Sequence, residues 1–204
     1  MSPTAESTPA PAPGGGNVPG REAVPDDGRE PGGAGQGSGN DRHCPHCGDR
    51  FPRNAGWPRT CPGCGRVRYR NPLPVAVALQ PVLLPSGGTA LLAIRRAIEP
   101  RRGLIALPGG FIDHGEDWRE AVVRELFEET RVRAEADRAR LFDVRGADGD
   151  HLLIFGLLPA LAVAELPPDL PTEETTGREL LTGPRELAFP LHTRVADAWF
   201  AARP

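Results

Sequence analysis

The stretch that decides the fold is GFIDHGEDWREAVVRELFEETRV, residues 110–132. It opens with glycine and then places Glu125, Glu128 and Glu129 within about one and a half helical turns. Like charges three or four residues apart on a helix repel each other. Such a cluster is either a solvated acidic face or the binding surface for a strongly positive group. The rest of the sequence distinguishes the two.

Residues 117–130 have the pattern of a helix. Its apolar residues fall on one broad side and predict the core face: Val122, Val123, Leu126 and Phe127. Glu125 and Glu129 fall on another side, and Glu128 lies beside Glu125. Arg124 is four residues before Glu128, so the two can form an ion pair that holds the carboxylate in place.

Two glycines, Gly109 and Gly110, precede this helix. Glycine permits positive φ and lets the backbone come close to a ligand. Gly115, Glu116 and Asp117 form the entry, where acidic residues suit the positive end of a helix. Because the acids are clustered and a Gly-Gly turn brings backbone to the same end, the sequence favours a bound cation over a solvated face.

The spacing from Gly110 to Val132 resembles the Nudix box. That motif is Gly, five residues, Glu, seven residues, Arg-Glu, an aliphatic residue, any residue, Glu-Glu, any residue, Gly and an aliphatic residue. Here five residues separate Gly110 from Glu116, and seven more lead to Arg124. Every fixed position matches except the last glycine, which is Arg131. Because that glycine normally ends the helix in a left-handed conformation, arginine there predicts a cost of roughly 1 kcal/mol.

The resemblance implies a Nudix hydrolase, an enzyme that cleaves nucleoside diphosphates linked to another group. Because substrate and carboxylates are both anionic, it also implies Mg²⁺ or Mn²⁺ between them. Such a cation prefers hard oxygen ligands, polarises phosphoryl oxygens and acidifies bound water. The implied metal ligands are Glu125 and Glu129, with Glu128 assisting.

The resemblance gives roles to further residues. A backbone carbonyl of Gly109 or Gly110 would also bind the metal, Arg124 would orient the glutamates, and Glu116 would brace the loop. Family members often supply one more acid, the catalytic base, from a loop before the last strand. The candidates here are Glu173, Glu174 and Glu179.

Two CxxC pairs precede this region, and each is followed by glycine. Thirteen residues separate the pairs, which consist of Cys44, Cys47, Cys61 and Cys64. This is the spacing of a zinc ribbon, in which two knuckles form a closed tetrahedral site, so the zinc would be structural. Redox-active pairs or free thiols are the alternatives. His43 and His46 are bystanders in this interpretation, because four cysteines saturate the site.

A zinc ribbon before a Nudix domain resembles two groups, the NADH pyrophosphatases and the FAD and ADP-ribose pyrophosphohydrolases. YRNP (69–72), LPGGF (107–111) and LAFP (187–190) are most like the second group. The Ser-Gln-Pro-Trp motif of the first group is absent from residues 139–155. Tyr69 is either a stacking residue for a base or a packing residue between ribbon and domain.

The remaining pattern predicts an α+β fold in which a mixed β-sheet is sandwiched between helices. Strands are expected over 75–84, 89–98, 141–146 and 151–166, with a broken apolar run over 104–113, a loop over 167–177 and a closing helix over 192–202. Pro81 predicts a strand edge or bulge, and Asp148 and Asp150 a hairpin turn.

Composition sets the domain organisation. Residues 1–40 lack large apolar side chains and are predicted to be a disordered tail, followed by the zinc ribbon at 41–70 and the Nudix domain at 71–204. The net charge of -3 and the lack of an apolar run of about 20 residues favour a cytoplasmic protein without membrane or nucleic-acid partners. The expected partner is a small-molecule nucleotide, and a homodimer is compatible with the resemblance.

The predicted function is Mg²⁺-dependent hydrolysis of the pyrophosphate bond of a compound such as ADP-ribose, FAD or NAD(H). The alternative is a non-catalytic nucleotide sensor that uses the ribbon to contact a partner or nucleic acid. Sensors usually lose glutamates of the box. This chain keeps all of them, namely Glu116, Glu125, Glu128 and Glu129, and the enzyme is therefore favoured.

Overall fold

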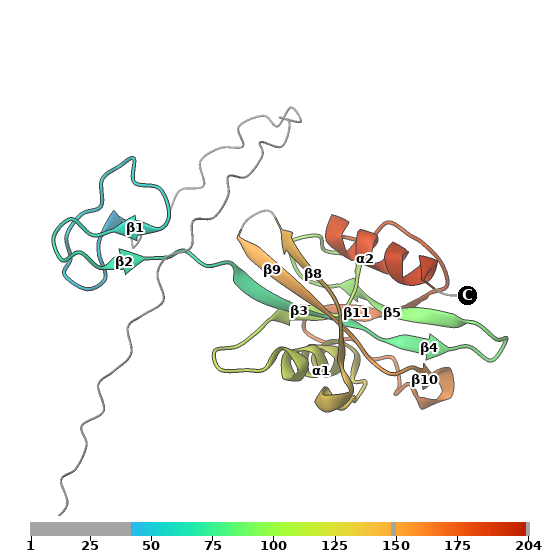
Figure 1. Ribbon diagram of the computed structural model, residues 1–204. Coiled ribbons are helices and arrows are strands. Elements are labelled where there is room, and N and C mark those ends of the chain that lie inside the picture. Colours follow the sequence, from blue (N-terminus) through green and yellow to red (C-terminus); the bar gives the residue numbers. More distant parts are fainter. Residues whose placement is uncertain (1–41, 148–149, 203–204) are drawn as a thin grey trace, which may run out of the picture. The chain divides into compact units, whose positions relative to one another are not determined.

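The computed structural model describes residues 42–147 and 150–202 (Figure 1). The chain divides into two compact units between Arg68 and Tyr69. The predicted disordered tail, residues 1–40, lies outside the described residues. Within the described ranges, no helix has the length and apolar character needed to cross a lipid bilayer.

The smaller unit contains one antiparallel pair of strands, β1 (Arg59–Thr60) and β2 (Val67–Arg68). Its buried apolar cluster is small and consists of Cys44, Phe51 and Cys61. A core of this size does not stabilise a fold by itself, so a unit of this kind depends on a metal or another cross-link.

The larger unit contains two mixed sheets. One has the order β10–β4–β5–β11, with β6 also paired to β5, and the other has the order β7–β3–β9–β8. Parallel pairing joins β3 to β9 and β4 to β10. The strands are β3 (Leu73–Leu79), β4 (Pro81–Leu83), β5 (Thr89–Arg96), β6 (Ile105–Ala106), β7 (Gly109–Phe111), β8 (Arg140–Ala147), β9 (His151–Leu157), β10 (Leu161–Ala162) and β11 (Thr175–Leu181).

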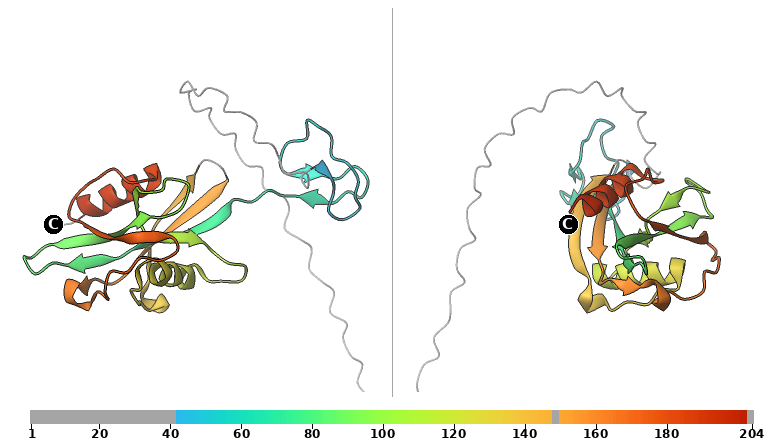
Figure 2. Two further views of the ribbon diagram at one scale, coloured as in Figure 1. Left: turned by 180° about the vertical axis from the view of Figure 1, so that it is seen from behind. Right: turned by 90° about the vertical axis from the view of Figure 1, so that its right-hand side faces the viewer.

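Two helices, α1 (Trp118–Thr130) and α2 (Pro190–Ala201), lie on opposite sides of these strands (Figures 1 and 2). Because side chains alternate along a strand, β3 contributes to both cores. Val77 and Leu79 join the cluster with α2, while Ala76 and Ala78 join the cluster with α1. The predicted arrangement of mixed strands between helices is confirmed. Two 3₁₀ turns, η2 (Ala136–Arg138) and η3 (Val163–Glu165), complete the secondary structure.

The prediction of one strand over 75–84 is wrong. The chain passes from one sheet to the other at Gln80, whose side-chain amide donates to the carbonyls of Pro81 and Pro159 at 2.9 and 2.8 Å. Pro81 is the first residue of β4, where a missing N–H is tolerated. It does not mark an edge, because β4 lies between β10 and β5.

Other boundaries also differ. The strand expected over 151–166 ends at Leu157, and the loop expected over 167–177 already contains the start of β11. The broken run 104–113 forms the short strands β6 and β7. The turn at Asp150 is confirmed by its positive φ of 67°. Asp148 lies outside the described residues.

Helix α1 begins and ends as its sequence predicts. The side chain of Asp117 accepts a hydrogen bond from the backbone N–H of Arg119, and Glu120 completes a capping box. At the other end, Arg131 has φ 62° and its N–H donates to the carbonyl of Phe127. This is the left-handed cap that glycine adopts without steric cost.

We therefore expect Arg131→Gly to raise the free energy of unfolding by about 1 kcal/mol, because glycine lacks the Cβ that is strained in this conformation. Arg131→Ala is the control, since alanine keeps the Cβ and should give no gain. Urea unfolding followed by tryptophan fluorescence measures both. Equal stability of the two variants would contradict the prediction.

Candidate functional site

Helix α1 turns part of its acidic surface toward the interior. Glu125 and Glu129 are 8% and 3% exposed, whereas Val123 and Phe127 are only half-buried. The predicted core face is therefore right for Val122 and Leu126, and Val123 packs against the same core cluster from its rim. Phe127 is not part of that cluster, and the two glutamates are buried in addition. Burying a carboxylate is costly unless a partner compensates it. The partners of this pair consequently define the site.

The glycines of β7 lie directly against the two carboxylates. The N–H of Gly109 donates to Oε2 of Glu129 at 2.9 Å. A Cβ on Gly109 would clash with the backbone carbonyl oxygen of Ala76, so only glycine fits there without a shift of the backbone. A Cβ on Gly110 would lie 2.5 Å from Oε1 of Glu125, which shows the close backbone approach that the sequence predicted. The backbone of β7 and the carboxylates of α1 form one surface.

Arg124 connects this surface to the loop before the helix. Its guanidinium makes two hydrogen bonds to the carboxylate of Glu116, at 2.7 and 2.9 Å, and one to Oε1 of Glu125, at 2.7 Å. It also donates to the carbonyl of Phe111 at 2.9 Å. Glu116 in turn accepts from the backbone N–H of Asp113 at 2.9 Å. These contacts fix the entry loop to the helix.

Glu128 differs from its neighbours. Its side chain is 55% exposed, and its contact with Arg124 is the longest of that guanidinium's ion pairs, at 3.4 Å. The structure brings Glu125 and Glu129 together under β7 but leaves Glu128 at the surface. Among the described residues, the cysteines are the one set of three or more metal-binding side chains close enough to share an ion. A cation at the glutamates would thus need backbone or water ligands as well.

Burial controls the protonation of the pair. Burial, together with the negative charges of Glu125 and Glu174, raises the pKa of Glu129 to about 8, although the hydrogen bond from the Gly109 N–H opposes the shift. Burial likewise raises the pKa of Glu125. Hydrogen bonds from Arg124 lower the pKa of Glu116. A divalent cation would compensate the two buried carboxylates in place of protons.

The surroundings of the three candidate bases distinguish them. The negative charge of Glu174 reaches both Glu125 and Glu129, since it contributes to the raised pKa of each. Glu179 instead forms ion pairs with Arg95 and Arg185. Glu173 is exposed. Of the three, only Glu174 contributes to the raised pKa of both buried glutamates.

Two residues near the pair were missed by the sequence analysis. The positive charge of Arg96 acts on Glu129 and opposes its raised pKa. The hydroxyl of Thr175 donates to the backbone carbonyl of Glu129 at 3.0 Å. The two consecutive arginines at the end of an apolar strand could have indicated Arg96 from the sequence. No local sequence pattern indicated Thr175, because β11 brings it to α1 through its pairing with β5.

The four cysteines lie together as predicted, with all four sulfur atoms within 4.8 Å of one another. The Sγ atoms of Cys44 and Cys64 are 3.7 Å apart, and those of Cys47 and Cys61 are 3.5 Å apart. Four thiolates around zinc, each about 2.3 Å from the ion, would be about 3.8 Å apart. Backbone N–H groups of Cys47 and His46 lower the pKa of Cys44 to about 6, which favours a thiolate. The donor set therefore fits a tetrahedral thiolate-binding metal.

Tyr69, the first residue of the larger unit, is 66% exposed. Its ring is thus accessible to a stacking partner, and its role in binding a base stays a prediction.

The raised pKa of Glu129 predicts how the stability of the metal-free protein depends on pH. Between the ordinary value of 4.5 and about 8, folded Glu129 keeps a proton that the unfolded chain has lost. Stability should therefore fall as pH rises through this window, by on the order of 1 kcal/mol per pH unit. Glu129→Gln should remove this component, whereas Glu128→Gln, at an exposed neighbour, should keep it. Urea unfolding from about pH 5.5 to about pH 7.5 tests this; parallel curves for wild type and Glu129→Gln would contradict it.

Comparisons with known proteins agree with this geometry. An ADP-ribose pyrophosphatase of Methanocaldococcus jannaschii is 44% identical over 63 residues, which is 31% of this chain and 36% of that protein. The NAD-capped RNA hydrolase NudC of Edwardsiella ictaluri is 33% identical over 95 residues, 45% of this chain and 34% of that protein. These matches span about a third of the length of either curated relative.

A solved NUDIX hydrolase from Nitrosomonas europaea has the same fold, with a TM-score of 0.57 and 24% identity over 79% of this chain and 92% of that one. The model of the NUDIX domain family matches residues 72–200, which include the helix, the glycine strand and the Arg124 contacts. The chain that carries these features belongs to the NUDIX domain family.

Proposed function

We propose that this protein is a Mg²⁺-dependent pyrophosphohydrolase that cleaves a nucleoside diphosphate linked to another moiety, of the ADP-ribose, FAD or NAD(H) type. The observation that supports it best is the buried pair Glu125 and Glu129 against the backbone of Gly109 and Gly110. An acidic pair buried beside a glycine strand has no structural benefit by itself. The two curated relatives, an ADP-ribose pyrophosphatase and an NAD-capped RNA hydrolase, support the substrate class.

The position of each residue in the site suggests its role. Glu125 and Glu129 would hold the cation, with a carbonyl of Gly109 or Gly110. When bound, Mg²⁺ or Mn²⁺ would supply charge neutralisation for the pyrophosphate and a more acidic water. Arg124 does not face the substrate in this proposal; it keeps Glu125 in place. Glu128, at the surface, would assist only as an outer ligand.

Glu174 is the proposed general base. It lies at the start of β11, where its backbone carbonyl accepts the N–H of Ala97 at 2.7 Å, so the strand pairing fixes its position. Its exposed carboxylate can take a proton from water and release it to solvent. The nearby buried pair provides the place where that water would be held.

The smaller unit has a separate role. We propose that residues 41–70 form a ribbon with one structural zinc and that residues 71–204 form the hydrolase domain. The closed set of four thiolates leaves no position for substrate on the zinc. The sensor alternative gains no support here, because all four glutamates of the box are present.

The enzymatic proposal predicts the effect of three substitutions. Glu129→Gln should lower Mg²⁺-dependent turnover of ADP-ribose by more than about 100-fold, because it removes a charged ligand. Glu174→Gln should lower kcat by about 100-fold with little change in KM, as for loss of a general base. Glu173→Gln is the matched control and should stay within about twofold of wild type.

The assay should cover ADP-ribose, FAD, NAD and NADH, with coupled phosphatase and phosphate detection. Mg²⁺ should be omitted rather than chelated, because a chelator would also remove zinc. Full turnover in Glu129→Gln would reject Glu129 as a ligand of the catalytic cation. No turnover of any compound by folded wild-type protein would reject the hydrolase and favour the sensor.

The zinc proposal predicts one zinc ion per chain by elemental analysis. Cys61→Ser should abolish the bound zinc and make residues 42–68 sensitive to protease, because this unit has few buried apolar groups. His46→Ala should keep the zinc, since four cysteines already complete the site. Retention of zinc in Cys61→Ser, or its loss in His46→Ala, would show a different ligand set.

A further inference from the structure

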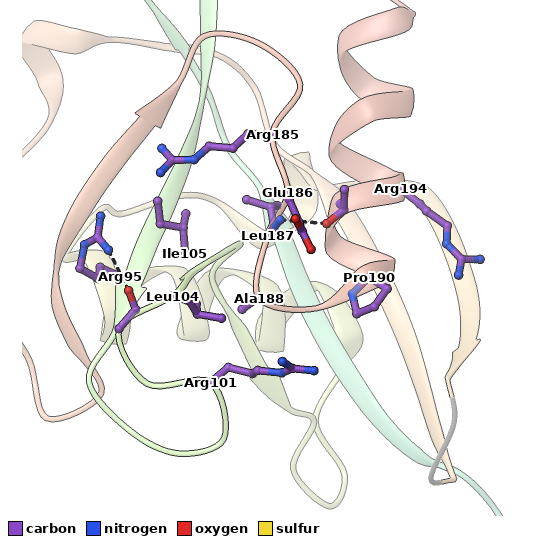
Figure 3. Close-up of a pocket in the computed structure, with 12 residues that line it drawn as sticks. Arg95, Arg101, Leu104, Ile105, Arg185, Glu186, Leu187, Ala188, Pro190 and Arg194 are labelled. Atoms are coloured by element: carbon purple, nitrogen blue, oxygen red, sulfur yellow. Dashed lines mark hydrogen bonds between the residues drawn. The ribbon is translucent and has the colours of Figure 1, made fainter. Parts of the chain in front are cut away.

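A cavity of about 640 Å³ lies outside the glutamate site (Figure 3). Its walls come from β5, the turn that leads to β6, the loop before α2 and the first turns of α2. None of its lining residues belongs to the stretch 109–132. Its size falls within the range of small-molecule sites.

The floor of the cavity is apolar. Ile105, Leu187 and Ala188 are buried, while Leu104 is 46% exposed beside them. An exposed leucine within a concave surface offers contact area for a ring or another apolar group. Thr193 also lines the cavity, but its hydroxyl already accepts a hydrogen bond from the N–H of Leu187 at 2.9 Å.

Four arginines surround this floor in Figure 3: Arg95, Arg101, Arg185 and Arg194. Arg95 and Arg185 both form ion pairs with Glu179, so one carboxylate is shared between two guanidinium groups. Glu186 is the one acid among the lining residues. The four positive groups outweigh these two carboxylates, and the cavity is therefore positive.

Arg101 and Arg194 carry the excess charge. Neither forms an ion pair or a side-chain hydrogen bond with another described residue, and both are exposed. Arg101 has a φ of 68°, a conformation that costs a non-glycine residue roughly 1 kcal/mol. In Figure 3 the two side chains lie on opposite sides of Pro190, Arg101 in the turn before β6 and Arg194 extending outward from α2. Guanidinium groups of this kind are suited to phosphate oxygens.

We propose that this cavity binds a nucleoside monophosphate, with the nucleoside over Leu104 and the apolar floor and the phosphate at Arg101 and Arg194. The inference rests on the proposed function for the choice of a nucleotide, because hydrolysis of an ADP-linked compound releases AMP. It adds a second site, away from the glutamates, that holds the released nucleoside monophosphate. Free phosphate offers the same charge but nothing for the floor.

The test is calorimetric titration of the full-length protein with AMP, adenosine and inorganic phosphate, in buffer without divalent cations. AMP should bind at least about tenfold more tightly than adenosine or phosphate, because only AMP uses both parts of the cavity. The double variant Arg101→Gln/Arg194→Gln should weaken AMP binding by about tenfold or more. Both side chains are exposed, so the substitutions leave the core intact.

Two controls locate the effect. Arg138→Gln/Arg145→Gln removes two exposed arginines elsewhere and should leave AMP binding unchanged. Glu129→Gln should also keep it, because the cavity contains no residue of the glutamate site. Unchanged AMP affinity in Arg101→Gln/Arg194→Gln would overturn the proposal, and equal affinity for phosphate and AMP would overturn the choice of a nucleotide. The titration measures binding without turnover. Its result can therefore be interpreted even if the protein shows no hydrolase activity.

Discussion

The guanidinium group of Arg124 is the contact on which the arrangement of the site depends. It joins three separate segments, because it donates to Glu116 in the entry loop, to the carbonyl of Phe111 after the glycines and to Glu125 on the helix. The side chains of Glu116 and Glu125 are only 14% and 10% exposed, so their carboxylates would cost free energy if left unpaired. One side chain thereby aligns the glycine strand with the helix, and Glu129 lies where Gly109 can reach it.

The two units resolve the same physical problem in different ways. In each, groups that become anionic are held close together, and bringing such charges out of water is costly. The cysteine set is closed, with four sulfur atoms at the spacing of a tetrahedral complex. The glutamate pair is open, since Glu125 and Glu129 face backbone groups on one side and Glu128 stays at the surface. A closed set suits structure, and an open set leaves room for exchangeable ligands.

Features with local causes could be predicted from the sequence. Asp117 caps α1 through atoms two residues away, and Arg131 takes the conformation that the end of a helix imposes. The four cysteines were recognisable from spacing alone. The family, the helix and the glycine contact were therefore all available before the structure, because each is encoded within about 30 residues.

Features with distant causes could not be predicted. The burial of Glu125 and Glu129 contradicts the usual amphipathic pattern, because β7 covers that side of the helix. The first three residues of β11 were interpreted as part of a loop and the rest were assigned to no element, since this strand pairs with β5 only across some 80 positions of sequence. Arg95 and Arg185 are brought to Glu179 by the same pairing. No local pattern distinguishes Arg101 from any other exposed arginine.

The passage through Gln80 has a consequence for folding. Within the described residues, the chain passes between the two sheets of the larger unit three times, and the shortest connection is this one residue between β3 and β4. Its backbone carbonyl accepts the N–H of Leu92 at 2.9 Å, while its side chain binds the carbonyls of Pro81 and Pro159. Because this connection is so short, the sheets cannot separate here without breaking these hydrogen bonds. The larger unit is thus tied into one cooperative block, in which loss of order in either sheet is transmitted to the other.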